Sequence, residues 1–124
     1  MNLNWVQIGS LLMFLAVALG AFGSHALKSK LSPHYFEVFQ TGVLYHFIHA
    51  FAIFLVAWLG TQSDDPNIQF AGVAFLTGIV FFSGSLYLLS ISEVKAIALF
   101  TPIGGVLFLA GWVLLFISRY KGLQ

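Results

Sequence analysis

The sequence predicts an all-α integral membrane protein, a single-domain, four-helix antiparallel bundle of 124 residues. Four apolar runs are each close in length to the ~20 residues that a helix needs to cross a bilayer. They cover residues 5–23, 42–60, 68–90 and 97–117. Charged side chains lie only between or beyond these runs. Because lipid offers no hydrogen bonds, continuous apolar runs of this length can satisfy their backbone groups only as helices.

The composition indicates the same class of protein. The chain is 60% hydrophobic and 7% charged, with a mean hydropathy of +0.97. A soluble domain of this size could not bury so much apolar surface, so we expect lipid to solvate part of it. The net charge of +1 argues against nucleic acid as a partner. The absence of cysteine excludes disulfides, thiolate catalysis and thiolate metal sites.

The first two spans are delimited by their flanking residues. No basic segment precedes residues 5–23, and the run exceeds a usual signal-peptide core in length, so we expect a retained helix. Ser32 and Pro33 fit an N-cap followed by a first-turn proline, which predicts a helix from there to about Gly60. That helix would be roughly 42 Å long against a hydrocarbon core of ~30 Å. Its start, residues 33–41, should therefore lie in the headgroup region.

The third span begins with a similar signal. Asp65 followed by Pro66 predicts a helix start, with a carboxylate as the cap at the positive helix end. Asp64 and Asp65 also form the loop between the second and third spans, whereas Lys28 and Lys30 lie between the first and second. With four spans, these two charged loops should lie on opposite faces of the membrane.

The fourth span contains a break signal. Thr101 and Pro102 form a second cap-and-proline pair inside the apolar run. Two alternatives remain: one kinked helix from about Glu93, or a short turn over residues 93–100 followed by a helix over residues 102–118. We expect this helix to be kinked or broken near Thr101-Pro102.

Small residues predict where the helices pack closely, since lipid provides no hydrophobic drive for association. The expected packing glycines are Gly20, Gly78, Gly84, Gly104 and Gly105. The alternative is that these glycines line a substrate path, but small residues at helix contacts are common in membrane proteins. Tryptophans and tyrosines near the ends of the runs, among them Trp112, are interpreted as markers of the membrane interface.

Polar side chains in or beside the spans form a candidate site, because ionisable groups in a membrane normally face protein or water and often mark function. They are His25, Glu37, Tyr45, His46, His49, Ser83, Ser85 and Tyr87. His46 and His49 share one helical face at a spacing of three residues, and Tyr45 stands one turn before His49. His25 ends the predicted first helix, so a short connection could bring it near the others.

Three interpretations of this candidate site remain open. The favoured one is that neutral imidazoles form hydrogen bonds between helices, at roughly 0.6 to 2 kcal/mol per bond. The second is a metal or haem site, but a His pair without a third nearby ligand is weak support, and we predict no metal or cofactor. The third is passage of protons or ions along the helix face from Glu37 to His49. Enzyme chemistry would need a nucleophile beside a base, and only a chance pairing of Ser83 or Ser85 with His49 would supply one.

Five runs in order along the chain resemble one family of small bacterial membrane proteins. They are Gly20 to Leu27, Glu37 to Val43, Tyr45 to Ala50, Phe82 to Tyr87 and Thr101 to Gly105. These runs resemble the YgdD/YwdK-like family, also called domain of unknown function 423, which is similar to animal transmembrane protein 256. The resemblance covers essentially the whole chain.

The resemblance implies a four-span membrane protein without an established activity. It carries over a histidine at His25, a glutamate at Glu37 and a histidine at His49, together with the serine–tyrosine and threonine–glycine runs. His46 departs from the family pattern, in which many bacterial relatives carry glutamine. Because glutamine cannot replace a metal-bound or proton-shuttling imidazole, the departure favours His25 and His49 as the more informative positions.

We therefore expect a multi-pass protein of the bacterial cytoplasmic membrane that is not an enzyme. It would bind a membrane lipid, a small apolar molecule or a protein partner through a weakly polar internal face, and it could form a homo-oligomer. The alternative function is a small oligomeric transporter or ion- or proton-conducting protein that uses Glu37, His25 and His49.

Overall fold

The computed structural model describes residues 3–121, and no strand occurs among them. In chain order the elements are α1 (Trp5–Val17), the π-helical η1 (Ala18–Gly23), α2 (Ser24–Leu27), α3 (Pro33–Gln62), α4 (Pro66–Ser92), the 3₁₀ segment η2 (Lys95–Leu99) and α5 (Thr101–Ile117). Four helical stretches are long and apolar enough to cross a membrane, namely α1 with its extension, α3, α4, and η2 with α5. The predicted all-α, four-span fold is confirmed.

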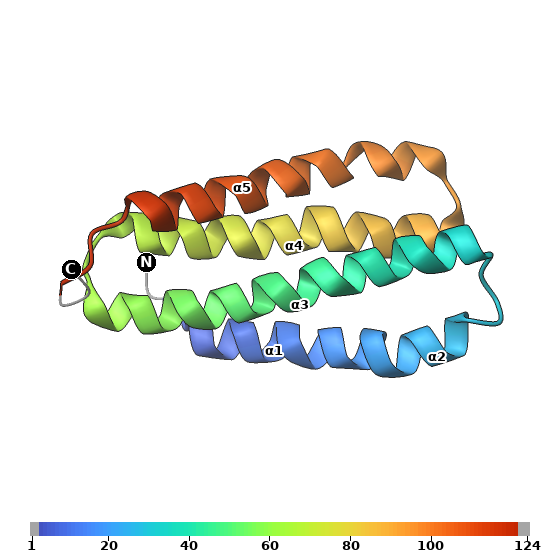
Figure 1. Ribbon diagram of the computed structural model, residues 1–124, viewed down its shortest axis with the longest axis horizontal. Coiled ribbons are helices and arrows are strands. Elements are labelled where there is room, and N and C mark those ends of the chain that lie inside the picture. The colour runs from blue at the N-terminus through green and yellow to red at the C-terminus, as the bar shows by residue number, and fades with distance from the viewer. Residues whose placement is uncertain (1–2, 122–124) are drawn as a thin grey trace.

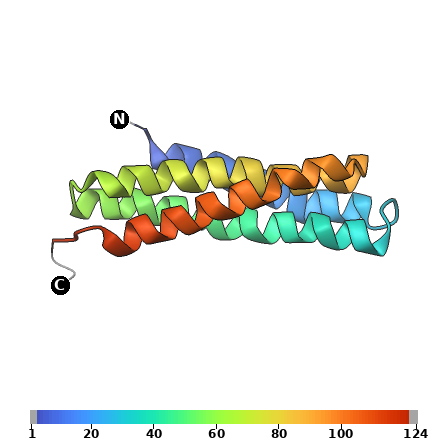
Figure 2. The ribbon, with the colours of Figure 1, turned by 90° about the horizontal axis from the view of Figure 1, so that it is seen from above.

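The helices lie side by side in the order α1, α3, α4, α5 (Figure 1). α3 and α4 form the central antiparallel pair, with α1 packed on α3 and α5 packed on α4. The α3–α4 loop, the start of α1 and the end of α5 gather at one end of the molecule, and the other two connections lie at the opposite end (Figure 1). α5 runs obliquely to α4, as the view from above shows (Figure 2).

The predicted starts of the two central helices are confirmed. Ser32 is the N-cap of α3, and its hydroxyl accepts a hydrogen bond from the Tyr35 backbone N–H at 3.3 Å. Asp65 caps α4 in the same way, accepting from the Asn67 N–H at 2.9 Å. Each cap satisfies one of the N–H groups that a helix start leaves without an internal partner. A proline follows each cap in the first turn, as expected.

The end of the first helix differs from the prediction. The predicted apolar span ends at Gly23, and His25 was expected to end the helix. In the structure Gly23 keeps a right-handed conformation, with φ −62° and ψ −46°, and the helix continues to Leu27. The π-helical segment η1 connects α1 to this extra turn. Because a π-helix has more residues per turn than an α-helix, it changes which face the residues after it present. The sequence carried no signal for this segment.

The fourth span is interrupted at Thr101-Pro102, which confirms the predicted kink or break, and it follows the alternative of a short turn and then a helix. α4 ends at Ser92, and Glu93 adopts a left-handed conformation with φ 57°. The 3₁₀ segment η2 follows, and α5 starts at Thr101 with Pro102 in its first turn. Proline cannot donate to a preceding helical turn, so a new helix start at this point leaves no bond unmade.

Three of the predicted packing glycines lie at close helix contacts. A Cβ built on Gly104 of α5 would overlap the backbone N and come within 2.6 Å of the Cα of Phe82 on α4. On Gly78 it would lie 2.5 Å from the Phe108 ring, and on Gly20 it would lie 3.0 Å from Val43. The neighbouring helix packs closely at each site because glycine has no side chain to hold it away.

The geometry contradicts a packing role for the other two glycines. A Cβ on Gly84 would have no neighbour nearer than the Ile79 carbonyl oxygen of its own helix, at 4.0 Å. A Cβ on Gly105 would meet only the Phe82 ring, also at 4.0 Å, which is an ordinary contact. The prediction was wrong at Gly84 because small-residue spacing does not reveal which helical face meets a neighbour.

The core of the molecule is apolar and narrow. Its buried members come mainly from α3 and α4, and they include Ile53, Val56, Ile68 and Phe75. The outer helices expose large apolar side chains, up to 89% exposure at Phe116. In a membrane these exposed faces are solvated by acyl chains. The fold thus has a packed centre and two lipid-facing flanks.

Candidate functional site

His49 is the best-connected of the predicted polar residues. Its side chain is only 4% exposed and lies on the core-facing side of α3. The imidazole stacks on the Phe108 ring of α5, with the two ring centroids 3.5 Å apart. Its Nδ1 lies 2.8 Å from the Tyr45 carbonyl oxygen, one turn earlier on α3. The Trp112 indole N–H donates to its Nε2 at 3.1 Å.

These two hydrogen bonds define the protonation of His49. A carbonyl oxygen can only accept, so the proton is on Nδ1, and an indole N–H can only donate, so Nε2 carries the lone pair. A second proton on Nε2 would point at the Trp112 N–H, and two donors that face each other cannot form a hydrogen bond. The surroundings therefore hold a neutral imidazole with both nitrogens occupied, which suits a structural hydrogen bond between helices and leaves no free nitrogen for a metal.

His46 forms a second inter-helix pair. Its Nδ1 lies 2.8 Å from the Tyr87 hydroxyl of α4, and its side chain is 3% exposed. The backbone of Leu12 on α1 lies against the ring. Within residues 3–121, Nε2 of His46 is buried and makes no hydrogen bond of normal geometry. His46 thus joins the two central helices through one nitrogen.

Two buried serines add further polar contacts between helices. Ser83 of α4 donates to the Gly42 carbonyl of α3 at 2.7 Å. The Ser85 hydroxyl lies 2.5 Å from the Thr101 hydroxyl at the start of α5 and donates to the Phe82 carbonyl at 2.8 Å. Both hydroxyls are engaged by oxygen partners rather than by an imidazole, so this arrangement does not supply an activated nucleophile.

His25 and Glu37 do not join the buried side chains. Both are exposed, His25 in the last turn of α2 and Glu37 near the start of α3. The predicted single cluster is therefore corrected to separate hydrogen-bonded pairs.

Tyr45 contacts His49, whose Nδ1 donates to the Tyr45 carbonyl oxygen, but its side chain is not buried with the histidine. Its side chain is 38% exposed, with its ring 4.6 Å from that of Phe82. Of the residues along the expected stripe from Glu37 to His49, only His49 is buried, so the stripe does not form a continuous internal path. Among residues 3–121, no three His, Asp or Glu side chains gather closely enough to hold a metal ion.

An apolar groove runs along α4 beside the helix break, with a volume of about 490 Å³. We call it the α4 groove, and its lining residues are Val80, Phe81, Gly84, Ser85, Tyr87, Leu88, Ile97 and Phe100. Gly84 leaves it open, since a Cβ there would touch no other helix. The hydroxyl of Tyr87 points inward to His46, so the part of Tyr87 that lines the groove is apolar. Sequence reasoning missed this groove, because its formation depends on the path of the chain after Ser92.

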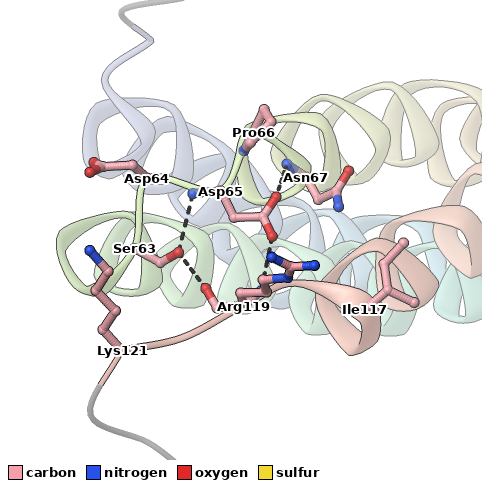
Figure 3. Close-up of a pocket in the computed structure, with 8 residues that line it drawn as sticks. All are labelled: Ser63, Asp64, Asp65, Pro66, Asn67, Ile117, Arg119 and Lys121. Atoms are coloured by element: carbon pink, nitrogen blue, oxygen red, sulfur yellow. Dashed lines mark hydrogen bonds between the residues drawn. The ribbon is translucent and has the colours of Figure 1, made fainter.

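A polar pocket of about 530 Å³ lies at the opposite end, between the α3–α4 loop and the end of α5 (Figure 3). Asp65 connects the two: one carboxylate oxygen accepts from the Asn67 N–H and the other from the Arg119 backbone N–H, each at 2.9 Å. The Ser63 hydroxyl donates to the Arg119 carbonyl. The hydrogen bonds from Asn67 and then Arg119 hold the pKa of the Asp65 carboxyl below its ordinary value.

The sequence profile described as "Protein of unknown function (DUF423)" matches residues 19–105 of this chain. The chain belongs to this family. The match includes the helix break, the α4 groove and both buried histidines, and it agrees with the resemblance seen in the five sequence runs.

Relatives of nearly the same length support this assignment. A UPF0382 membrane protein of Staphylococcus aureus strain RF122 is 41% identical over 118 residues, which cover 94% of this chain and 95% of the relative. The UPF0382 membrane protein YwdK of Bacillus subtilis is 40% identical, with coverages of 94% and 96%. No solved structure matches the chain. Together with the four apolar helices, these relatives identify a multi-pass membrane protein.

Proposed function

We propose that this chain is a non-enzymatic membrane component that holds one acyl chain of a membrane lipid in the α4 groove. The observation that carries the proposal is the groove itself, an open apolar channel of about 490 Å³ at the helix break. Its α4 lining residues run from Val80 to Leu88, so it extends about 12 Å along the helix.

The depth of the groove favours a lipid as its occupant. Leu88 lies four residues before the end of α4 at Ser92, or about 6 Å along the helix axis. The groove therefore begins just below the polar end of the helix and extends into the hydrocarbon layer. At that depth acyl chains replace water as the solvent, and an apolar wall whose two hydroxyls, of Ser85 and Tyr87, are engaged within the protein suits them.

The absence of an assembled reaction centre within residues 3–121 is consistent with a binding role. His49 has both nitrogens engaged by Tyr45 and Trp112. Ser83 and Ser85, the hydroxyls that enzyme chemistry would need, bond to other oxygens. The polar side chains thus maintain the positions of the helices around the groove.

Filling the groove with a side chain tests the proposal. Gly84→Leu adds apolar volume where a Cβ meets nothing closer than 4.0 Å, so the fold should tolerate it. The matched control is Val113→Phe, which adds volume to an exposed side chain on α5. The full chain would be purified in mild detergent, and its bound lipid measured by native mass spectrometry, with the melting temperature recorded for each variant.

We expect the wild type and Val113→Phe to retain lipid and Gly84→Leu to lose it at an unchanged melting temperature. Equal retention by Gly84→Leu and the wild type would contradict the proposal. So would a photo-crosslinker at position 84 that attaches to another polypeptide in native membranes rather than to lipid, because that result would assign the groove to a protein partner.

A further inference from the structure

The connection between α4 and η2 carries two opposite charges, two and four residues before Ile97, a lining residue of the α4 groove. Glu93 follows the last residue of α4, and Lys95 begins η2. Both side chains are exposed. Ile97, which lines the groove, lies two residues after Lys95, a separation of at most about 7 Å along the chain. The charged pair is therefore placed at the polar end of an apolar channel.

Glu93 occupies a backbone conformation that is unusual for its residue type. Its φ of 57° is left-handed, and it is the only non-glycine residue between 3 and 121 with a positive φ. Glycine would take this conformation without steric strain, and asparagine would do so more easily than glutamate. The Glu93 backbone N–H closes the end of α4 by donating to the Leu89 carbonyl oxygen at 2.8 Å, a contact that does not use the carboxylate.

We infer that the lipid in the α4 groove is a phospholipid with an amino group in its headgroup, its phosphate bound by Lys95 and its ammonium by Glu93. The inference rests on the proposed function and names the lipid class that the site selects. Lys95 supplies donors and a positive charge for a phosphate, and Glu93 supplies an acceptor and a negative charge for an ammonium.

The pair of charges distinguishes this lipid class from simple anionic lipids. A lysine alone near the membrane surface attracts any anionic headgroup. A glutamate beside it offsets that attraction for a headgroup with net negative charge and adds a partner for one that also carries an ammonium. The net charge of the pair is zero, which complements a zwitterion.

The experiment compares two lipids with the same acyl chains. Dioleoyl phosphatidylethanolamine and dioleoyl phosphatidylglycerol would be titrated separately into the purified full chain, with bound lipid counted by native mass spectrometry. The variants are Lys95→Gln and Glu93→Gln, and Gln preserves the size of each side chain. Lys30→Gln is the control, since Lys30 is exposed but lies in the α2–α3 connection rather than beside the groove.

We expect the wild type to prefer phosphatidylethanolamine by about fivefold, the ratio that one surface charge contact supplies. Glu93→Gln should abolish the preference, Lys95→Gln should weaken binding of both lipids, and Lys30→Gln should change neither. Equal binding of the two lipids by the wild type, or an effect of Lys95→Gln no larger than that of Lys30→Gln, would overturn the inference.

Gly84→Leu, measured in the same titrations, separates the two proposals. If it abolishes binding of both lipids while the wild type shows no preference between them, the groove holds the acyl chain and only the headgroup inference fails. If Gly84→Leu binds both lipids as the wild type does, the proposed function fails and the headgroup inference fails with it.

Discussion

The indole N–H of Trp112 on α5 donates to Nε2 of His49 on α3, with 3.1 Å between the two nitrogens. This bond links two helices that otherwise pack mainly on α4 rather than on each other. The Phe108 ring stacks on the same imidazole at 3.5 Å, so one face of His49 is shielded while its edge is hydrogen-bonded. Trp112 is thus more than a marker of the membrane interface.

Replacing His49 should reveal the energy of this link. His49→Leu leaves the Trp112 N–H without a partner, and we expect a loss of about 1 kcal/mol in the free energy of unfolding, as for typical hydrogen bonds between membrane helices. His49→Gln should lose less, because the amide oxygen can still accept. The measurement is thermal or denaturant unfolding of each variant in the same detergent.

A double-mutant cycle provides the control. Trp112→Phe removes the donor, so in the His49→Leu background it should cost less than it does in the wild type. Additive losses in the double variant would show that the two side chains are not coupled, and the hydrogen bond would then contribute nothing measurable.

Neighbouring glycines on α5 should respond differently to the same substitution. A methyl group on Gly104 would overlap the backbone of Phe82, whereas on Gly105 it would lie 4.0 Å from the Phe82 ring. We expect Gly104→Ala to destabilise the protein by about 1–3 kcal/mol through overpacking. Gly105→Ala should leave the melting temperature unchanged or raise it slightly, since alanine favours helix. Similar melting temperatures for the two variants would contradict the close approach of α4 and α5.

The helix starts could be predicted because their signals are local. A serine or aspartate followed by proline satisfies a helix N-terminus through atoms within three residues, so Ser32 and Asp65 were identified from the sequence alone. The π-helical segment could not be predicted, because it depends on how α1 packs against α3. Gly20 lies within that segment and faces Val43 and Phe47 of α3.

The candidate site was predictable in part. Two imidazoles in an apolar span must face protein, and His46 and His49 are both buried. Their partners, Tyr87 and Trp112, lie 41 and 63 residues away along the chain, so helix packing alone determines which donor meets which acceptor. His25 lies in the last turn of the first helical stretch, close to where it was predicted, but it is exposed and does not join the buried histidines.

The membrane topology can be tested directly, because the chain contains no cysteine. Ser29 lies in the connection between α2 and α3, and Asp64 lies in the loop at the opposite end of the helices. In sealed vesicles a membrane-impermeant maleimide should label Ser29→Cys or Asp64→Cys, but not both, until the vesicles are opened. Labelling of both variants from one side before opening would refute the four-span topology.

Acid should weaken the connection between the α3–α4 loop and the end of α5. The ionised Asp65 carboxylate accepts from Asn67 and Arg119, and these bonds hold its pKa below the unfolded value, about 3.9. A lowered pKa in the folded state stabilises the protein above the unfolded pKa. That contribution is lost as the pH falls through the folded pKa.

The melting temperature of the wild type should therefore exceed that of Asp65→Asn at pH 6, and the difference should shrink below about pH 4. Asn at position 65 can still cap α4, but its amide has one acceptor oxygen and cannot also accept from Arg119, so the variant measures mainly the second bond. Asp64→Asn is the matched control, because it removes a neighbouring exposed carboxylate and leaves the Asp65 bonds in place. A difference between the wild type and Asp65→Asn that persists undiminished at low pH would show that the charge of Asp65 does not stabilise this end of the fold.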